Sequence, residues 1–161
     1  MLEQGQIGRA VGIIDSLLES RPKNLRVKTA AVKVKAGFLL YDPSKTRLRD
    51  QIRVIPGELS PEALATASEI AESIVKIAEF QANDFVAADP DNSGNKYYYP
   101  AWWEAQATQA FVLYQRHRTN PADMDKHITF VRALSLQAPN LGKNVAGPRV
   151  AASLKWILDQ K

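Results

Sequence analysis

Apolar residues recur at helical spacing along most of this chain, and most densely between Pro100 and Arg118. One face of that segment carries apolar side chains at positions i, i+4, i+7, i+8 and i+11, namely Trp103, Ala107, Ala110, Phe111 and Tyr114. The apolar arc is widened to nearly half of the circumference by Trp102, Leu113 and His117. Proline suits the first turn of a helix, where its missing N–H has no partner to lose. We therefore predict a helix that begins at Pro100 and has other helices packed on more than one side.

The same spacing predicts five further helices. Their expected spans are 2–20, 24–41, 61–88 and from Asn120-Pro121 to the break at Pro139, with a last helix that opens at Gly147-Pro148. A polar cap followed by proline marks the starts at Ser60-Pro61 and Asn120-Pro121. The first helix contains Gly5, Gly8 and Gly12, and each glycine weakens it by about 1 kcal/mol relative to alanine. Such glycines are tolerable if a neighbouring helix packs closely against them.

Residues 24–41 show two apolar faces on opposite sides of the predicted helix, which suits a helix sandwiched inside a stack. Polar seams separate the two faces. Arg26 and Lys33 lie along one seam, and Lys28 and Lys35 lie along the other. The alternation V-K-V-K also fits a strand, but the flanking alanines and the length of the pattern favour a helix.

The stretch from Asp42 to Ser60 is the longest irregular piece, and we predict a connection there. Within it, residues 48–55 fit a short turn of helix before the turn at Pro56-Gly57. No strand is predicted anywhere in the chain. The expected fold is therefore all-α, with about six helices arranged mostly as antiparallel neighbours.

Composition narrows the class of protein. The chain has 161 residues, enough for one domain with a sizeable core. It contains no cysteine, which excludes disulfides, thiolate metal sites and thiol nucleophiles, and we expect a cytoplasmic location. No apolar run approaches the roughly 20 residues of a membrane span. The opening M-L-E-Q-G-Q lacks the basic and apolar regions of a signal peptide, so we expect no membrane contact.

Charge is distributed unevenly along the chain. Between Arg21 and Arg53 there are ten basic residues and two acidic ones, whereas between Val54 and Glu104 there are nine acidic residues and two basic ones. Such asymmetry can steer an acidic partner toward one end of a molecule. It also fits a solvated surface whose two halves attract each other.

One segment imitates a calcium site. Asp89, Asp91, Ser93 and Gly94 fall where an EF-hand loop needs its positions 1, 3, 5 and 6. Position 12, however, is Pro100 instead of a bidentate glutamate. A helix that stops at a glycine turn explains the same residues, so we expect no bound ion.

The remaining candidates for chemistry are weaker. His117 and His127 lie on consecutive predicted helices near Asp123 and Asp125, without the short, regular spacing of zinc ligands. No Walker loop, G-x-S-x-G elbow or dinucleotide-binding glycine turn is present. We expect no cofactor, no metal and no catalytic residue, so the chain is not predicted to be an enzyme.

Five clustered aromatic residues could stack on sugars or bases. They are Tyr97, Tyr98, Tyr99, Trp102 and Trp103. Aromatic residues beside a basic surface can bind single-stranded nucleic acid, but this cluster adjoins the acidic block in sequence. Aromatic residues at helical spacing more often belong to a core. We expect the tryptophans to be core residues and the three tyrosines, which precede the helix, to be the more exposed members.

Two parts of the chain resemble the tetratricopeptide repeat (TPR), a helical hairpin of 34 residues. The opening G-Q-I-G-R-A-V-G-I-I-D-S-L-L-E-S-R-P-K-N is similar to the second helix of such a repeat, with Ala10 at the small position and Pro22 at the closing proline. Leu17 departs from the usual alanine. A-W-W-E-A-Q-A followed by I-T-F-V-R-A-L-S-L-Q-A-P-N-L-G resembles a complete hairpin, with Val131 and Pro139 in register. His127 stands there in place of a small residue.

The resemblance implies stacked antiparallel hairpins that form a right-handed superhelix. It also implies a chain that begins in the middle of a repeat, as a fragment of a longer protein would. We divide the single predicted domain into a degenerate repeat (1–41), a connection (42–60), a long helix and loop (61–96), a second hairpin (97–142) and a terminal helix (143–161).

The function implied by the resemblance is a protein-interaction scaffold. In TPR proteins the first helix of each hairpin lines a concave groove, and the register from Pro22 makes residues 24–41 such a helix. Its groove-facing seam then carries Arg26, Thr29 and Lys33, which we predict to bind a protein or an acidic peptide.

Two alternatives stay open. A basic helical module could bind nucleic acid through Lys45, Arg47, Arg49 and Arg53 together with the neighbouring helix. The chain could also be a non-catalytic helical part of a larger enzyme or assembly. Steep salt dependence of binding to generic DNA or RNA would favour the first alternative.

Overall fold

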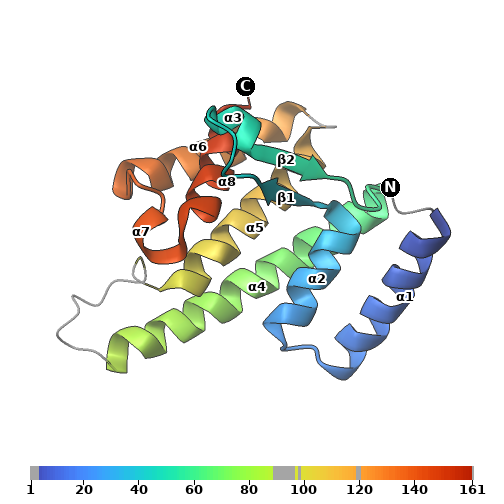
Figure 1. Ribbon diagram of the computed structural model, residues 1–161. Coiled ribbons are helices and arrows are strands. Elements are labelled where there is room, and N and C mark those ends of the chain that lie inside the picture. Colours follow the sequence, from blue (N-terminus) through green and yellow to red (C-terminus); the bar gives the residue numbers. More distant parts are fainter. Residues whose placement is uncertain (1–3, 89–96, 98, 119–120, 161) are drawn as a thin grey trace.

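The structure is a computed structural model that describes residues 4–88, 97, 99–118 and 121–160. These residues form eight helices and one two-stranded sheet (Figure 1). The elements are α1 (Gln4–Ser20), α2 (Leu25–Ala36), β1 (Phe38–Tyr41), α3 (Leu48–Gln51), β2 (Ile52–Ile55), α4 (Pro61–Ala88), α5 (Pro100–His117), α6 (Pro121–Gln137), α7 (Lys143–Ala146) and α8 (Pro148–Leu158). The predicted all-α class is confirmed.

Helix α5 lies at the centre of the fold and is surrounded on several sides. It contacts α4, α6 and α8, and also α2, α7 and β1. Its Trp102, Trp103 and Phe111 are buried among the core residues. The prediction that the Pro100 helix needs partners on more than one side is therefore confirmed.

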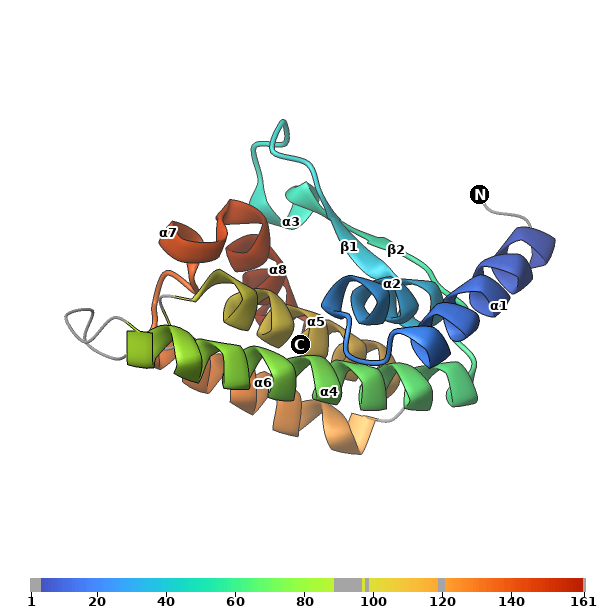
Figure 2. The same cartoon turned by 90° about the horizontal axis from the view of Figure 1, so that it is seen from below.

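Helix α4 carries α2 and α5 side by side, as Figure 2 shows from below. The surface that it offers them is rich in alanine, and Ala67, Ala71 and Ala78 are almost completely buried. Small side chains let helix backbones approach closely, so two helices can share one face of α4. A second, larger cluster of buried side chains joins α5 to α6, α8 and the strands, and includes Trp103, Phe111, Val131 and Leu154.

The second helix is shorter than predicted. It ends at Ala36, and the expected helical residues Phe38–Tyr41 instead form β1. Gly37 ends the helix at φ 83°, a left-handed value that favours glycine, and its N–H bonds to Lys33 O at 3.1 Å. The sequence F-L-L-Y fits either a helical face or a short strand, and pairing with β2 decides between them.

The predicted connection is a β-hairpin with one helical turn in it. β1 and β2 pair antiparallel, with Phe38 opposite Ile55 and Tyr41 opposite Ile52. The expected turn of helix in residues 48–55 is present as α3, but its second half is a strand. The prediction that the chain contains no strand is therefore wrong at this place.

Two glycines allow the base of the hairpin to lie in main-chain contact with the end of α2. A Cβ on Gly37 would lie 2.2 Å from the carbonyl oxygen of Ile55, and a Cβ on Gly57 would lie 2.5 Å from the nitrogen of Gly37. Beyond this crossing, Glu58 N–H bonds to Val34 O at 3.0 Å and Leu59 N–H bonds to Lys35 O at 3.1 Å. The chain that leaves β2 thus satisfies carbonyls that the end of α2 would leave without donors.

Helix α1 is the outermost helix and packs against α2. An ion pair of 3.3 Å joins its Asp15 to Lys35. No atom lies within 4 Å of a Cβ built on Gly5, Gly8 or Gly12, so no close neighbour offsets these glycines within the described residues. Over the same part of the chain, no helix combines the length and the apolar character needed to cross a membrane.

Candidate functional site

A groove opens between α2 and α5, which rest on the same face of α4. Its wider part is a pocket of about 370 Å³. The pocket has Ile74 and Ala78 of α4 among its lining residues, and both side chains are buried, so the floor is apolar. The two walls come from α2 and α5.

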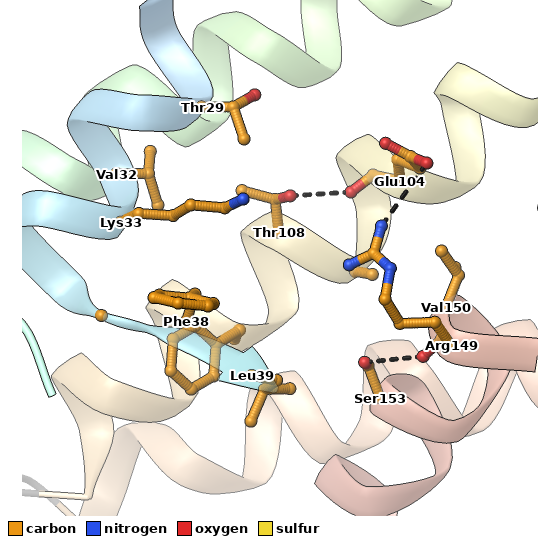
Figure 3. Close-up of a pocket in the computed structure, with 13 residues that line it drawn as sticks. Thr29, Val32, Lys33, Phe38, Leu39, Glu104, Thr108, Arg149, Val150 and Ser153 are labelled. Atoms are coloured by element: carbon orange, nitrogen blue, oxygen red, sulfur yellow. Dashed lines mark hydrogen bonds and ion pairs between the residues drawn. The ribbon is translucent and has the colours of Figure 1, made fainter. Parts of the chain in front are cut away.

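The groove continues into a smaller pocket of about 100 Å³ toward α8 (Figure 3). The small pocket is closed by Gly37, Phe38 and Leu39 at the start of the hairpin and by Arg149, Val150 and Ser153 of α8. Four residues line both pockets, namely Thr29, Lys33, Glu104 and Thr108. The two pockets are therefore parts of one continuous groove.

The structure places the three predicted binding residues on one wall of this groove. Arg26, Thr29 and Lys33 all line the wide pocket, and Thr29 and Lys33 also line the small one. Their spacing of three and four residues keeps them on one face of α2. Their binding of a partner stays a prediction.

The other two lysines of α2 are engaged elsewhere. Lys28 Nζ donates a hydrogen bond of 2.8 Å to Ser73 Oγ on α4, and Lys35 forms the ion pair with Asp15. Arg26 and Lys33, by contrast, make no ion pair with any residue that the structure describes. The two polar seams of α2 therefore differ. The seam with Lys28 and Lys35 contacts neighbouring helices, and the seam with Arg26 and Lys33 faces the groove.

Lys33 is held at the mouth of the small pocket by an aromatic ring. Its Nζ lies 5.2 Å from the centroid of the Phe38 ring, within the range of a cation–π contact. Figure 3 shows the lysine extending from α2 toward α5. The hairpin, which the sequence did not predict, thus positions one of the predicted residues.

The opposite wall carries an ion pair that the sequence did not predict. Glu104 Oε1 of α5 lies 3.5 Å from Arg149 Nη2 of α8 (Figure 3). Arg149 also has its main-chain oxygen bonded by Ser153 Oγ at 2.8 Å. These residues are far apart in sequence on two helices, and nothing in either helix alone signals that they meet.

The groove carries a net positive charge. Among the described residues, its lining contains the cations Arg26, Lys33 and Arg149 and one carboxylate, that of Glu104. That carboxylate faces Arg149, so its field is partly neutralised. The groove therefore presents cations above an apolar floor, which suits a negatively charged ligand that also has apolar parts.

The other sequence candidates lie outside the groove. The calcium-like segment 89–94 falls outside the described residues, as do the side chains of Asp123, Asp125 and His127. His117 is buried on α5. Among the described residues, no group of three or more His, Cys, Asp or Glu side chains is placed to hold a metal ion.

The aromatic cluster is mostly internal. Trp102 and Trp103 are buried, and Tyr97 packs edge-on against Trp102 with ring centroids 5.2 Å apart. Tyr97 donates its hydroxyl hydrogen bond to Gln137, and Tyr99 donates one of 3.2 Å to Gln81. Both tyrosines are half-buried and therefore more exposed than the two tryptophans, as predicted, whereas Tyr98 lies outside the described residues.

The basic residues of the nucleic-acid alternative lie on the hairpin. Lys45, Arg47, Arg49 and Arg53 are exposed, and none of them lines the groove. In the same segment, the hydroxyl and then the N–H of Ser44 hold the pKa of Asp42 below its ordinary value of 3.8.

Comparison of the chain with known protein families, with curated proteins and with solved structures gave no match.

Proposed function

We propose that this chain is a protein-interaction scaffold that captures an acidic segment of a partner protein in the groove between α2 and α5. The observation that carries the proposal is the placement of Arg26 and Lys33, which line the groove and make no ion pair among the described residues. The resemblance to TPR hairpins, in which a first helix lines a binding groove, supports the same assignment. A TPR-like superhelical stacking of the hairpins is part of this proposal.

The dimensions of the groove favour a segment of chain as the ligand. Arg26 and Lys33 are seven residues apart, which is about 10 Å along a helix. An extended peptide covers that distance with about three residues. A peptide with two acidic residues at this spacing can meet both cations at once.

Charge and apolar surface have different roles in this mechanism. The cations raise the rate of encounter with an acidic segment and set its register, and added salt screens this effect. The half-buried apolar lining residues Leu25, Ala30 and Ala101 supply affinity when side chains of the ligand displace water from them. Binding therefore requires both acids and apolar groups in the ligand.

The test is selection from a display library of random peptides, followed by binding measurements on variants. We expect the selected peptides to be enriched in aspartate and glutamate. The double variant Arg26→Glu with Lys33→Glu should weaken their binding at least about tenfold. Circular dichroism should show that the variant keeps its helical fold, because the charges of both residues face the groove.

The matched control reverses two charges on the hairpin, Lys45→Glu with Arg47→Glu. Both residues are exposed and lie outside the groove. Their reversal changes the net charge of the chain by the same amount as the reversal of Arg26 and Lys33. We expect this control to keep most of the peptide binding. The proposal fails if the groove variant binds the selected peptides as the parent does, or if the hairpin control loses them instead.

A further inference from the structure

We infer that the captured segment carries one leucine-sized aliphatic residue beside its acids, and that this residue enters the small pocket between α2, β1, α5 and α8. This inference rests on the proposed function and adds a sequence requirement to it. The acidic residues then extend from the anchor along α2 toward Arg26.

The walls of the small pocket are apolar where they are deepest. Val32, Leu39, Phe111 and Val150 all line it, and each of these side chains is buried. A charged or strongly polar ligand group placed among them would lose its hydration without gaining a partner. The inner part of the pocket therefore selects an apolar side chain.

The volume of the pocket sets the size of that side chain. About 100 Å³ is available, which is less than the roughly 150 Å³ of a protein cavity that holds a benzene ring. A leucine, isoleucine or valine side chain fits this volume, whereas an indole ring would extend out of it into the wider part of the groove. The pocket therefore distinguishes aliphatic anchors from aromatic ones.

The rim of the pocket sets the position of the first acid. Lys33 lies at the boundary of the two pockets, with its ammonium over the Phe38 ring. On the opposite rim, Arg149 is paired with Glu104. A carboxylate close to the anchor residue therefore meets the ammonium of Lys33, which has no carboxylate partner among the described residues.

The second cation fixes the spacing of the motif. Arg26 lines only the wide pocket, two helical turns away from Lys33. In an extended ligand, a second acid about three residues beyond the first reaches it. The motif is thus an aliphatic anchor, an adjacent acid, and a second acid about three residues further along, in either chain direction.

The experiment measures binding of four labelled synthetic peptides to the whole chain by fluorescence anisotropy. The first peptide contains the motif with leucine as the anchor, and two others replace that leucine by alanine or by tryptophan. The fourth keeps the leucine and replaces both acids by serine. We expect the motif peptide to bind at least about tenfold more tightly than each of the other three. Burial of one leucine accounts for a factor of this size against the peptides that lack it, and loss of the two acids that face Lys33 and Arg26 accounts for it in the serine peptide.

Two protein variants reshape the pocket in opposite directions. Ala107→Leu adds volume at a half-buried residue of the pocket wall and should reduce leucine binding to the level of the alanine peptide. Val150→Ala enlarges the pocket and should shift the preference from leucine toward tryptophan. A shift of preference is informative even where the first variant folds poorly, because it is a gain of binding for one peptide.

The possible results distinguish a failure of the leucine-anchor inference from a failure of the proposed function. If the leucine and alanine peptides bind equally and both depend on Arg26 and Lys33, the anchor is overturned and the proposed function stands. If no acidic peptide binds, or if the double charge reversal has no effect on binding, the proposed function fails as well. Displacement of the motif peptide by oligothymidylate from the groove would overturn both in favour of a nucleic-acid strand.

Discussion

The side-chain amide of Gln115, on α5, donates a hydrogen bond of 3.0 Å to the main-chain carbonyl oxygen of Ala36, the last residue of α2. Both residues are buried. The three preceding carbonyls of α2 are satisfied by Gly37, Glu58 and Leu59, so Gln115 completes the set of four that a helix leaves open at its end. The bond also fixes the end of α2 against α5, and hence the width of the groove between them.

We predict that Gln115→Met lowers the free energy of unfolding by about 1–3 kcal/mol, because Ala36 O would stay buried without a donor. Denaturant unfolding followed by circular dichroism measures the loss. Gln106→Met on the same helix is the control. Gln106 is equally buried, but its Oε1 accepts no hydrogen bond from the residues described, so its replacement should be neutral or stabilising. Equal losses in both variants would contradict this account of the bond.

Gly142 lies against the indole ring of Trp103. A Cβ at Gly142 would lie 2.4 Å from Trp103 Cδ2, and the residue has φ 73°, so alanine would be both strained and in collision. We predict that Gly142→Ala destabilises the fold by at least about 2 kcal/mol. Tryptophan fluorescence should report the same change if Trp103 is displaced into a wetter environment.

The control for Gly142 is a glycine at which an added Cβ would meet no neighbouring segment. No atom lies within 4 Å of a Cβ built on Gly12, which is exposed in the middle of α1. Gly12→Ala should therefore raise the helix propensity of α1 and stabilise it by about 1 kcal/mol. Thermal unfolding of the two variants should show shifts of opposite sign. A loss of stability in Gly12→Ala would mean that a partner approaches this face of α1.

The stability of the hairpin turn should depend on pH through the carboxyl group of Asp42. Hydrogen bonds from the hydroxyl and the N–H of Ser44 favour the carboxylate, so the pKa of Asp42 is lower in the folded chain than its ordinary 3.8. The stabilisation of this turn is therefore present above about pH 4 and is lost as the pH falls through the folded pKa. We predict that Ser44→Ala raises the pKa of Asp42 toward 3.8, measured by NMR titration of the carboxyl carbon. An unchanged titration would show that the Ser44 hydroxyl does not set this pKa.

Glu104 is the one acidic residue in the groove lining over the part of the chain that the structure describes. We predict that Glu104→Gln tightens binding of the acidic motif peptide by a factor of about 2–5 and makes that binding more sensitive to salt. Stability should change by less than about 1 kcal/mol, because the ion pair with Arg149 is exposed. Anisotropy titrations at two salt concentrations measure both effects. Weaker binding would indicate that the orientation of Arg149 by Glu104 matters more than the removed repulsion.

Local signals in the sequence predicted the long helices well. Proline at a first helical position marked the starts of α4, α5, α6 and α8, because this preference depends on the residue itself and not on distant partners. The same holds for Arg26, Thr29 and Lys33. Their shared face follows from the periodicity of one helix, whatever packs around it.

The parts that were not predicted depend on contacts between distant segments. Phe38–Tyr41 is compatible with either a helix or a strand, and its pairing with Ile52–Ile55 makes it a strand. The approach of Arg149 to Glu104 likewise requires α8 to pack beside α5. Gly37 did carry a local signal, since glycine commonly follows the last residue of a helix, but the apolar periodicity continued past it.

The two ends of the hairpin differ in their tolerance of sequence changes, because Gly37 and Gly57 cross at its base. Gly37 and Gly57 meet main chain to main chain, and no side chain can be added at either without moving the end wall of the groove. The tip around Pro43 and Ser44 is exposed at the opposite end of the hairpin. Insertions at the tip, including a reporter tag, can therefore accumulate while the ligand-facing surface keeps its shape. At the base, even one added carbon atom would change that shape.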